Sequence, residues 1–408
     1  MTTSSSRPHP WRWMVLASRF VFCFIALGGF KALGVFLPYF ILYLSTSSVS
    51  VGVISSSLPG AGYILIGSFA GVLLKVFTPR QITISGGFVA AVSMCVASFS
   101  VSSNQIAVCF VLASVGQALC FVSSTKPCME YFPDDFAFAN GASLAGGTTG
   151  MMVLPPVMEY LVSVYGWRRA LGLMGAFTFN YVVCGALLRP RNKSSLPAQY
   201  SLVPSRSIVE NASAKSGGLA DGRDQDDEGN PAKFNFGQIV KYVRERFDAH
   251  ILVEPLFVII SVVSTLEGIL FGMWHLYLIP QGVELGFGDS PSAFLATFGG
   301  AGSLLGRISH GFPIDRGHIK ATSLFTISCL IFAASNMLDP LVVTSYIAIA
   351  AIAFVSGVAF GVIYPLMFVL MRDVTGDRHM SAYGWLFVTH GIGVLLGGAL
   401  AGKDGFMI

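Results

Sequence analysis

Long apolar segments separated by short polar turns run through most of the chain. Each segment holds roughly 20 residues, and its apolar positions are continuous rather than alternating, which is typical of a membrane-spanning helix. We therefore predict eleven spans, near residues 13–44, 52–74, 80–101, 105–126, 139–163, 168–188, 251–278, 290–312, 319–337, 341–371 and 380–402.

The composition of the chain leads to the same interpretation. Hydrophobic residues make up 53% of the chain and charged residues only 11%, against about 25% charged residues in a soluble domain. Because so few charges cannot cover a water-facing surface, the apolar side chains must face lipid. There, only helices and closed barrels satisfy their own backbone polar groups. The predicted fold class is an all-α membrane protein.

A polar stretch near residues 190–248 divides the predicted spans into six before it and five after it. It is rich in Ser, Asp, Lys and Arg and poor in aromatic residues, which predicts a largely disordered linker. If the N-terminus is cytoplasmic, most Lys and Arg outside the spans share its side, and the other side carries only Arg168, Arg169 and Lys403. This bias predicts that the N-terminus and the linker are cytoplasmic.

The predicted domain organisation follows from these assignments. It consists of a cytoplasmic tail at 1–12, a six-helix bundle at 13–188, a cytoplasmic linker at 189–250, a C-terminal bundle of five spans at 251–402 and a tail at 403–408.

The two bundles carry a weak internal repeat. Small residues followed by charges stand after the second span, at Gly67–Arg80, and after the eighth span, at Gly306–Lys320. Parallel repeats at corresponding positions are typical of transporters whose two bundles rock around a central site. Close helix packing and loop capping would also explain these residues.

Four segments together resemble the monocarboxylate transporter family of the major facilitator superfamily. They are Lys31–Phe36, Glu130–Gly150, Tyr165–Ala170 and Asp373–Arg378. The resemblance covers nearly all of residues 11–402 and implies a major facilitator-type transporter of two helical bundles that works by alternating access. The family has twelve spans, so we expect that the twelfth is missing from this sequence.

Lys31 and Arg307 are the candidate substrate-binding residues. Lys31 lies inside the first apolar span, where a charge costs roughly 2.5–3.5 kcal/mol unless it is paired or functional. Arg307 lies in the last third of the eighth span, and a guanidinium can grip a carboxylate through two parallel hydrogen bonds. The resemblance implies that Lys31 receives the anion and that Arg307 anchors it. Snorkelling toward the membrane surface would explain either residue without a ligand.

Proton coupling depends on a position that this chain has changed. The family places an Asp four residues before its Arg in the eighth span, and this chain has Ser303 there, which cannot titrate near neutral pH. Glu267, in the middle of the seventh span, is the candidate proton-coupling residue and the candidate counter-ion to Lys31 or Arg307. A structural polar contact between helices would also explain Glu267.

The tight turn after the eighth span supplies a candidate gate. Asp315 and Arg316 are predicted to make cytoplasmic contacts that break as the bundles rock, although plain loop charges fit the same pattern. The loop between the fourth and fifth spans departs from the family, because Asp134 and Asp135 replace its basic pair.

Several other functional classes have no support in the sequence. There is no Gly–Lys–Ser phosphate loop for an ATP-driven pump, no nucleophile–base motif for an enzyme and no Cys/His spacing for a metal site. A net charge of +4 gives no argument for nucleic-acid binding. We expect no metal and no cofactor.

The predicted function is secondary transport of monocarboxylates or related small organic anions, with or without a linked proton. Ser303 leaves open a proton-independent facilitator of amino acids or similar metabolites. The missing twelfth span leaves open a non-transporting paralogue or a regulatory membrane protein. The resemblance implies a plasma-membrane location and, for some of the family, a single-span chaperone as partner.

Overall fold

The computed structural model describes residues 10–44, 62, 66, 69, 73–74, 77–189, 249–338, 342, 345–375 and 379–403. Within these ranges every regular element is a helix, as the fold class predicts. Nearly all of the predicted linker, and most of the span predicted at 52–74, lie outside the described residues.

The helices of the first half follow the predicted spans. They are α1 (Arg12–Ala32), the 3₁₀ turn η1 (Leu33–Phe36), α2 (Leu37–Leu44), α4 (Pro79–Ala97), α5 (Ser103–Tyr131), α6 (Phe136–Tyr165), α7 (Trp167–Thr178) and α8 (Asn180–Leu187). The last two together cover the span predicted at 168–188.

The second half contains five long helices, a short helix and a 3₁₀ turn. They are η4 (Ala249–Val253), α11 (Pro255–Glu284), α12 (Asp289–Ser309), α13 (Gly311–Asp315), α14 (Ala321–Leu338), α15 (Tyr346–Thr375) and α16 (His379–Lys403). Each long helix coincides with one of the five predicted spans, and α13 is the turn that holds the candidate gate.

Six helical segments of the described chain are long and apolar enough to cross a membrane. They are Arg12–Phe36, Pro79–Ala97, Ser103–Tyr131, Trp167–Leu187, Ala321–Leu338 and Tyr346–Thr375. Shorter apolar segments occur at Pro255–Phe271 and Ser381–Gly397. The helices α6 and α12 are long enough but are rich in glycine and small polar residues, and they pack against each other where the two halves meet.

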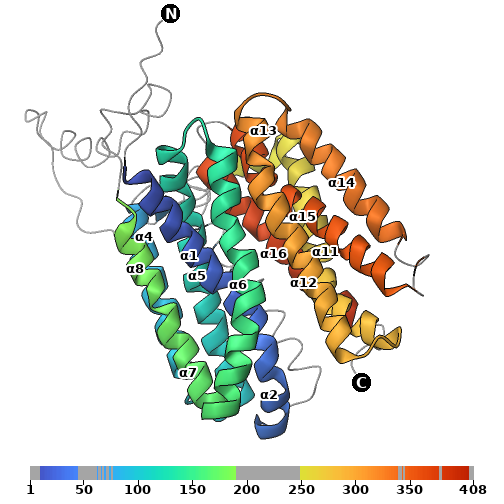
Figure 1. The fold of residues 1–408 in the computed structure, drawn as a ribbon. Helices are drawn as coiled ribbons and strands as arrows, with labels where there is room; N and C mark the ends of the chain where they lie inside the picture. The colour runs from blue at the N-terminus through green and yellow to red at the C-terminus, as the bar shows by residue number, and fades with distance from the viewer. Residues whose placement is uncertain are drawn as a thin grey trace, which may run out of the picture.

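The two halves lie side by side, the first in blue to green and the second in yellow to red (Figure 1). In each half the first helix packs along the fifth, α1 on α6 and α11 on α16. A Cβ atom on Gly150 would collide with the Phe24 carbonyl oxygen, and one on Gly393 with the Thr265 carbonyl oxygen. Glycine therefore permits close approach at equivalent places, which supports the internal repeat.

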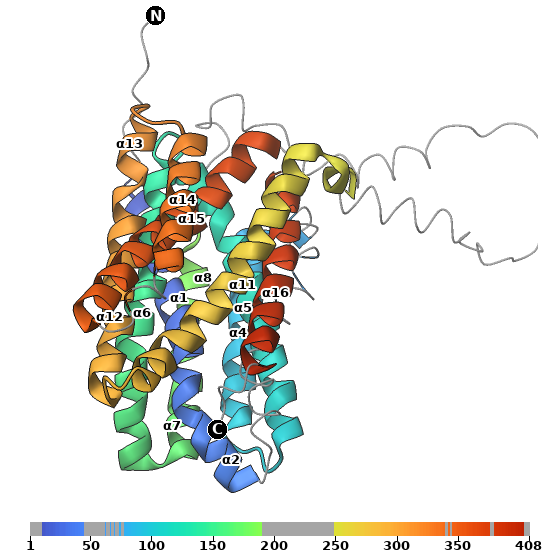
Figure 2. The ribbon, with the colours of Figure 1, turned by 90° about the vertical axis from the view of Figure 1, so that its right-hand side faces the viewer.

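We call the end of the molecule where α1 and α11 begin, and where α8 ends, the linker end, and the opposite end the far end. The short helix α13 lies at the linker end, and α16 runs toward the far end (Figures 1 and 2). The halves are joined by contacts of α6 with α12, α13 and α15, and of α5 with α16.

Candidate functional site

Arg307 is buried where the two halves meet. It lies in the last turn of α12, and only 1% of its surface is exposed. Its Nη1 donates a 2.6 Å hydrogen bond to the carbonyl oxygen of Leu144 on α6, in the other half. Its guanidinium carbon lies 5.7 Å from the centre of the Tyr364 ring. Among the described residues, Nε of Arg307 has no hydrogen-bond partner.

A small cavity of about 30 Å³ lies beside this guanidinium. Both halves line it, with Leu27, Phe30 and Gln117 from the first half and Phe271, Arg307, Tyr364, His390 and Val394 from the second. The space suits a water molecule and is too small for an organic anion. A position between the repeats is where transporters of this architecture bind their substrates.

Glu267 meets a partner that the sequence did not reveal. Its Oε2 lies 2.8 Å from Nδ1 of His390, which joins α11 to α16, and both side chains are buried. The two atoms are in ion-pair contact, but across the described chain neither forms a well-aligned hydrogen bond. The His390 ring also lies 5.6 Å from that of Tyr364, which lines the same cavity. Glu267 interacts electrostatically with Arg307.

The structure thus brings Glu267 and Arg307 to one region, and Lys31 is not among the residues that line the cavity there. Lys31 is half-buried in the last turn of α1, and its neighbour Phe30 lines the cavity. Ser303 is buried one turn before Arg307, and its carbonyl group packs against Gly361 of α15. The role of Glu267 as counter-ion to Lys31 or Arg307 stays a prediction, because the contact found is with His390.

Asp315 connects the halves at the linker end. Its two carboxylate oxygens accept hydrogen bonds from the backbone nitrogens of Ala137 (3.1 Å) and Phe138 (2.7 Å), in the first turn of α6. The N-terminus of a helix favours a negative charge. Burial raises the pKa of Asp315 above its ordinary value, and these two hydrogen bonds act in the opposite direction. Arg316, by contrast, stacks within its own half, 4.0 Å from the Phe312 ring centre.

Arg19 is a buried cation that the sequence analysis missed. It lies in α1 and is fully buried. The sequence signal for Arg19 is one arginine inside an apolar run. A single charge hardly changes the hydropathy of a span, so this signal is weak.

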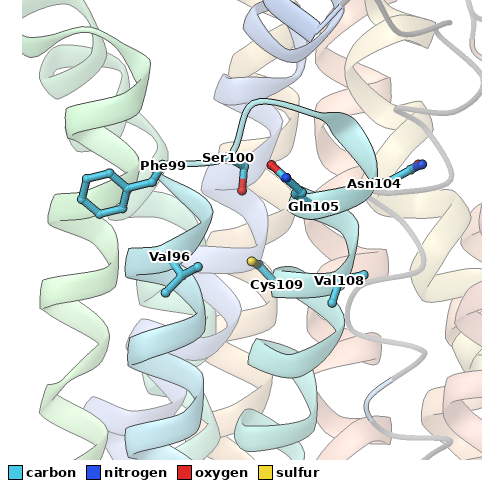
Figure 3. Close-up of a pocket in the computed structure, with 7 residues that line it drawn as sticks. All are labelled: Val96, Phe99, Ser100, Asn104, Gln105, Val108 and Cys109. Atoms are coloured by element: carbon cyan, nitrogen blue, oxygen red, sulfur yellow. The ribbon is translucent and has the colours of Figure 1, made fainter.

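A second, larger depression of about 510 Å³ lies at the far end between α4 and α5. Cys109 points into it and Phe99 points away (Figure 3). Its lining comes from the first half alone, so it is separate from the site between the halves. The lining residues are Val96, Phe99, Ser100, Asn104, Gln105, Val108 and Cys109.

Comparison with known proteins identifies the architecture. The family model of the Major Facilitator Superfamily matches residues 20–402. The chain belongs to the major facilitator superfamily. Its members are transporters, which confirms the predictions of a two-bundle transporter fold and of a protein that is not an enzyme. The crystal structure of the superfamily transporter FucP in the outward conformation matches 96% of this chain and 89% of its own, with a TM-score of 0.61 and 16% identity.

Within the superfamily, the chain is similar to monocarboxylate transporters, as its motifs predict. It is 26% identical to Monocarboxylate transporter 12-B of Danio rerio, over 96% of this chain and 80% of that protein. It is also 26% identical to Monocarboxylate transporter 14 of Mus musculus, over 97% of this chain and 86% of that protein.

The substitution Asp315→Ala should destabilise the closed linker end. It removes two charge-assisted hydrogen bonds to the start of α6, which should lower the free energy of unfolding by about 1–3 kcal/mol. Asp373→Ala is the matched control, because Asp373 is 53% exposed and pairs with its neighbour Arg372, and should change stability by less than about 0.5 kcal/mol. Thermal unfolding of the purified protein measures both. Equal effects of Asp315→Ala and Asp373→Ala would contradict the assignment of Asp315 as a stabilising contact between the halves.

Proposed function

We propose that this superfamily member moves monocarboxylates or related small organic anions by alternating access, with Arg307 as the anion anchor. The observation that carries the proposal is the burial of Arg307 between the halves. Among the described residues, no carboxylate lies within ion-pair distance of its guanidinium, which hydrogen-bonds to the carbonyl group of Leu144. A guanidinium keeps its charge at any physiological pH, so an incoming carboxylate is a fitting partner.

The contacts of the two halves suggest how the site would open. Arg307 donates a hydrogen bond to Leu144 of α6, and Asp315 accepts two hydrogen bonds from the first turn of the same helix. Both contacts cross between the halves and would break when the linker end opens. The cavity beside Arg307 would then widen enough to admit or release an organic anion. We propose that Asp315 is the gate and that Arg316 supports the turn that carries it.

Lys31 is proposed as the second cation that the anion meets. It lies 12 residues beyond Arg19 on α1, toward the far end, and next to the cavity-lining residue Phe30. The basic residues outside the spans favour a cytoplasmic linker end, so an anion from outside would reach Lys31 before Arg307. A plasma-membrane location remains the expectation for such a carrier.

Proton coupling is proposed to pass through Glu267 and His390. A buried carboxylate in contact with an imidazole can share one proton with it. Among the described residues, charged or titratable groups near the pair include Arg307 on α12, Tyr364 on α15 and Cys329 on α14. Binding of an anion at Arg307 would change the field at Glu267, which links the proton to the substrate.

A proton-independent facilitator is the second candidate function. Ser303 occupies the position one turn before Arg307, where the related family has an acid, and a hydroxyl group cannot carry the proton. If the Glu267–His390 pair serves only packing between α11 and α16, the carrier would move its solute without a proton.

The substitutions Arg307→Gln and Arg307→Lys should both abolish most of the uptake of labelled pyruvate or lactate by proteoliposomes. Charge-assisted hydrogen bonds are worth about 1.5–3 kcal/mol, which corresponds to a loss of roughly tenfold or more in uptake at low substrate. Lysine keeps the charge but not the bidentate geometry. The control is Arg169→Gln at an exposed residue, which should leave uptake unchanged. Uptake at the wild-type level in both Arg307 variants would contradict the proposal that Arg307 binds the anion.

The substitutions Glu267→Gln and His390→Gln should each flatten the dependence of uptake on pH. Each removes one member of the pair that would hold the proton, and uptake is measured between about pH 5 and 8. The expected result is uptake that no longer rises with an inward proton gradient. Unchanged pH dependence in both variants would overturn this route for the proton. Wild-type uptake that does not depend on pH would favour the proton-independent facilitator instead.

A further inference from the structure

Arg19 is fully buried in α1 and carries a charge that the described part of the protein does not neutralise. Its Nη2 donates a 3.2 Å hydrogen bond to Oγ1 of Thr125 on α5. Its Nε and Nη1 have no hydrogen-bond partner there, and no ion pair joins Arg19 to a described carboxylate. Its guanidinium carbon lies 5.7 Å from the centre of the Phe121 ring, and the thiol of Cys128 lies beside it.

This arrangement contributes little to stability. A buried charge is normally paired, and the thiol and hydroxyl groups beside Arg19 are weak or neutral acceptors. Apolar side chains of similar volume often replace buried charges at no cost or with a gain in stability. Two free donors on a fixed positive charge therefore fit a negatively charged ligand better than they fit a packing role.

The position of Arg19 relates it to the site at Arg307. Cys23, one helical turn after Arg19, lies near both Arg19 and Arg307. Along α1, Arg19 lies about 10 Å from the linker-end start of the helix and about 18 Å from Lys31, at 1.5 Å per residue. Arg19 therefore lies on the linker side of Lys31.

The ring that covers Arg19 is also a contact between the halves. Phe121 lies 5.1 Å from Phe387 on α16 and 6.2 Å from Phe368 on α15, measured between ring centres. Close by, the hydroxyl group of Tyr383 on α16 lies 3.8 Å from the sulfur of Met129 on α5. Opening of the linker end would separate these rings and give a ligand access to the guanidinium.

We propose that Arg19 forms a second anion-binding site, near Arg307 and on the linker side of Lys31, which takes the carboxylate group of the travelling solute when the linker end opens. The proposal rests on the proposed function, because it assumes that an anion leaves Arg307 toward the linker end. The site binds one carboxylate at the free Nη1 of Arg19, beside the hydroxyl group of Thr125, which accepts a hydrogen bond from Nη2. Transfer from Arg307 to Arg19 would divide the path across the apolar interior into two shorter steps.

The test is thermal unfolding of the purified full chain against increasing pyruvate, with chloride in a parallel series. A ligand that binds the folded protein raises its stability. The variants are Arg19→Met, Arg19→Lys and Arg307→Met. Without anion, Arg19→Met should melt at or above the wild-type temperature. The pyruvate concentration that stabilises Arg19→Met should be at least about tenfold higher than the one that stabilises the wild type. The concentration for Arg19→Lys should fall between these two values.

Each other outcome overturns a stated part of the proposal. A pyruvate titration of Arg19→Met that matches the wild type, beside a weakened Arg307→Met, overturns the second site alone. A weakened Arg19→Met beside an unchanged Arg307→Met overturns Arg307 as the anchor. Equal responses to chloride and pyruvate overturn the assignment to carboxylates, and a wild type insensitive to both anions overturns both sites.

Discussion

A positive charge that cannot be lost, held inside an apolar interior, is the constraint on which this structure depends. The guanidinium of Arg307 has one hydrogen bond, to a carbonyl group of the opposite half, and an aromatic face beside it. Retaining an ion there costs several kcal/mol unless a partner offsets it. The interface between the halves is consequently both the place where the protein is joined and the place where an anion would be most stabilised.

The helix α6 connects this charge to the linker end. Its first turn binds the carboxylate of Asp315 and, about two helical turns later, the carbonyl group of Leu144 binds Arg307. Arg307 and Asp315 belong to the continuous segment α12–α13, so both contacts hold this segment against α6. An anion that competes with Leu144 for Arg307 would weaken one of the two contacts. It would therefore favour separation of α13 from α6 at the linker end. The shared segment is a physical reason why binding of an anion at the proposed site of Arg307 would be coupled to opening at the proposed gate, Asp315.

Most of the fold was predictable, because a helix in lipid must satisfy its own hydrogen bonds and therefore leaves a long apolar run in the sequence. Arg307 and Glu267 became candidates because each places a charge in such a run, and the family resemblance singled out Arg307. Their partners were not predictable. His390 lies on another helix, and the partners of Asp315 and Arg307 are backbone groups, which leave no mark in the sequence. Arg19 was missed because a single charge hardly changes the hydropathy of a span, and only its complete burial marks it out.

The most direct test of the central claim is a cryo-electron microscopy structure of the protein with a brominated benzoate, whose bromine marks the ligand unambiguously. The account predicts ligand density between the halves, with the carboxylate within about 4 Å of the Arg307 guanidinium, the range of an ion pair, and with the hydrogen bond to Leu144 lengthened or broken. A ligand bound elsewhere, or one whose carboxylate points away from Arg307 while the Leu144 contact stays intact, would contradict it.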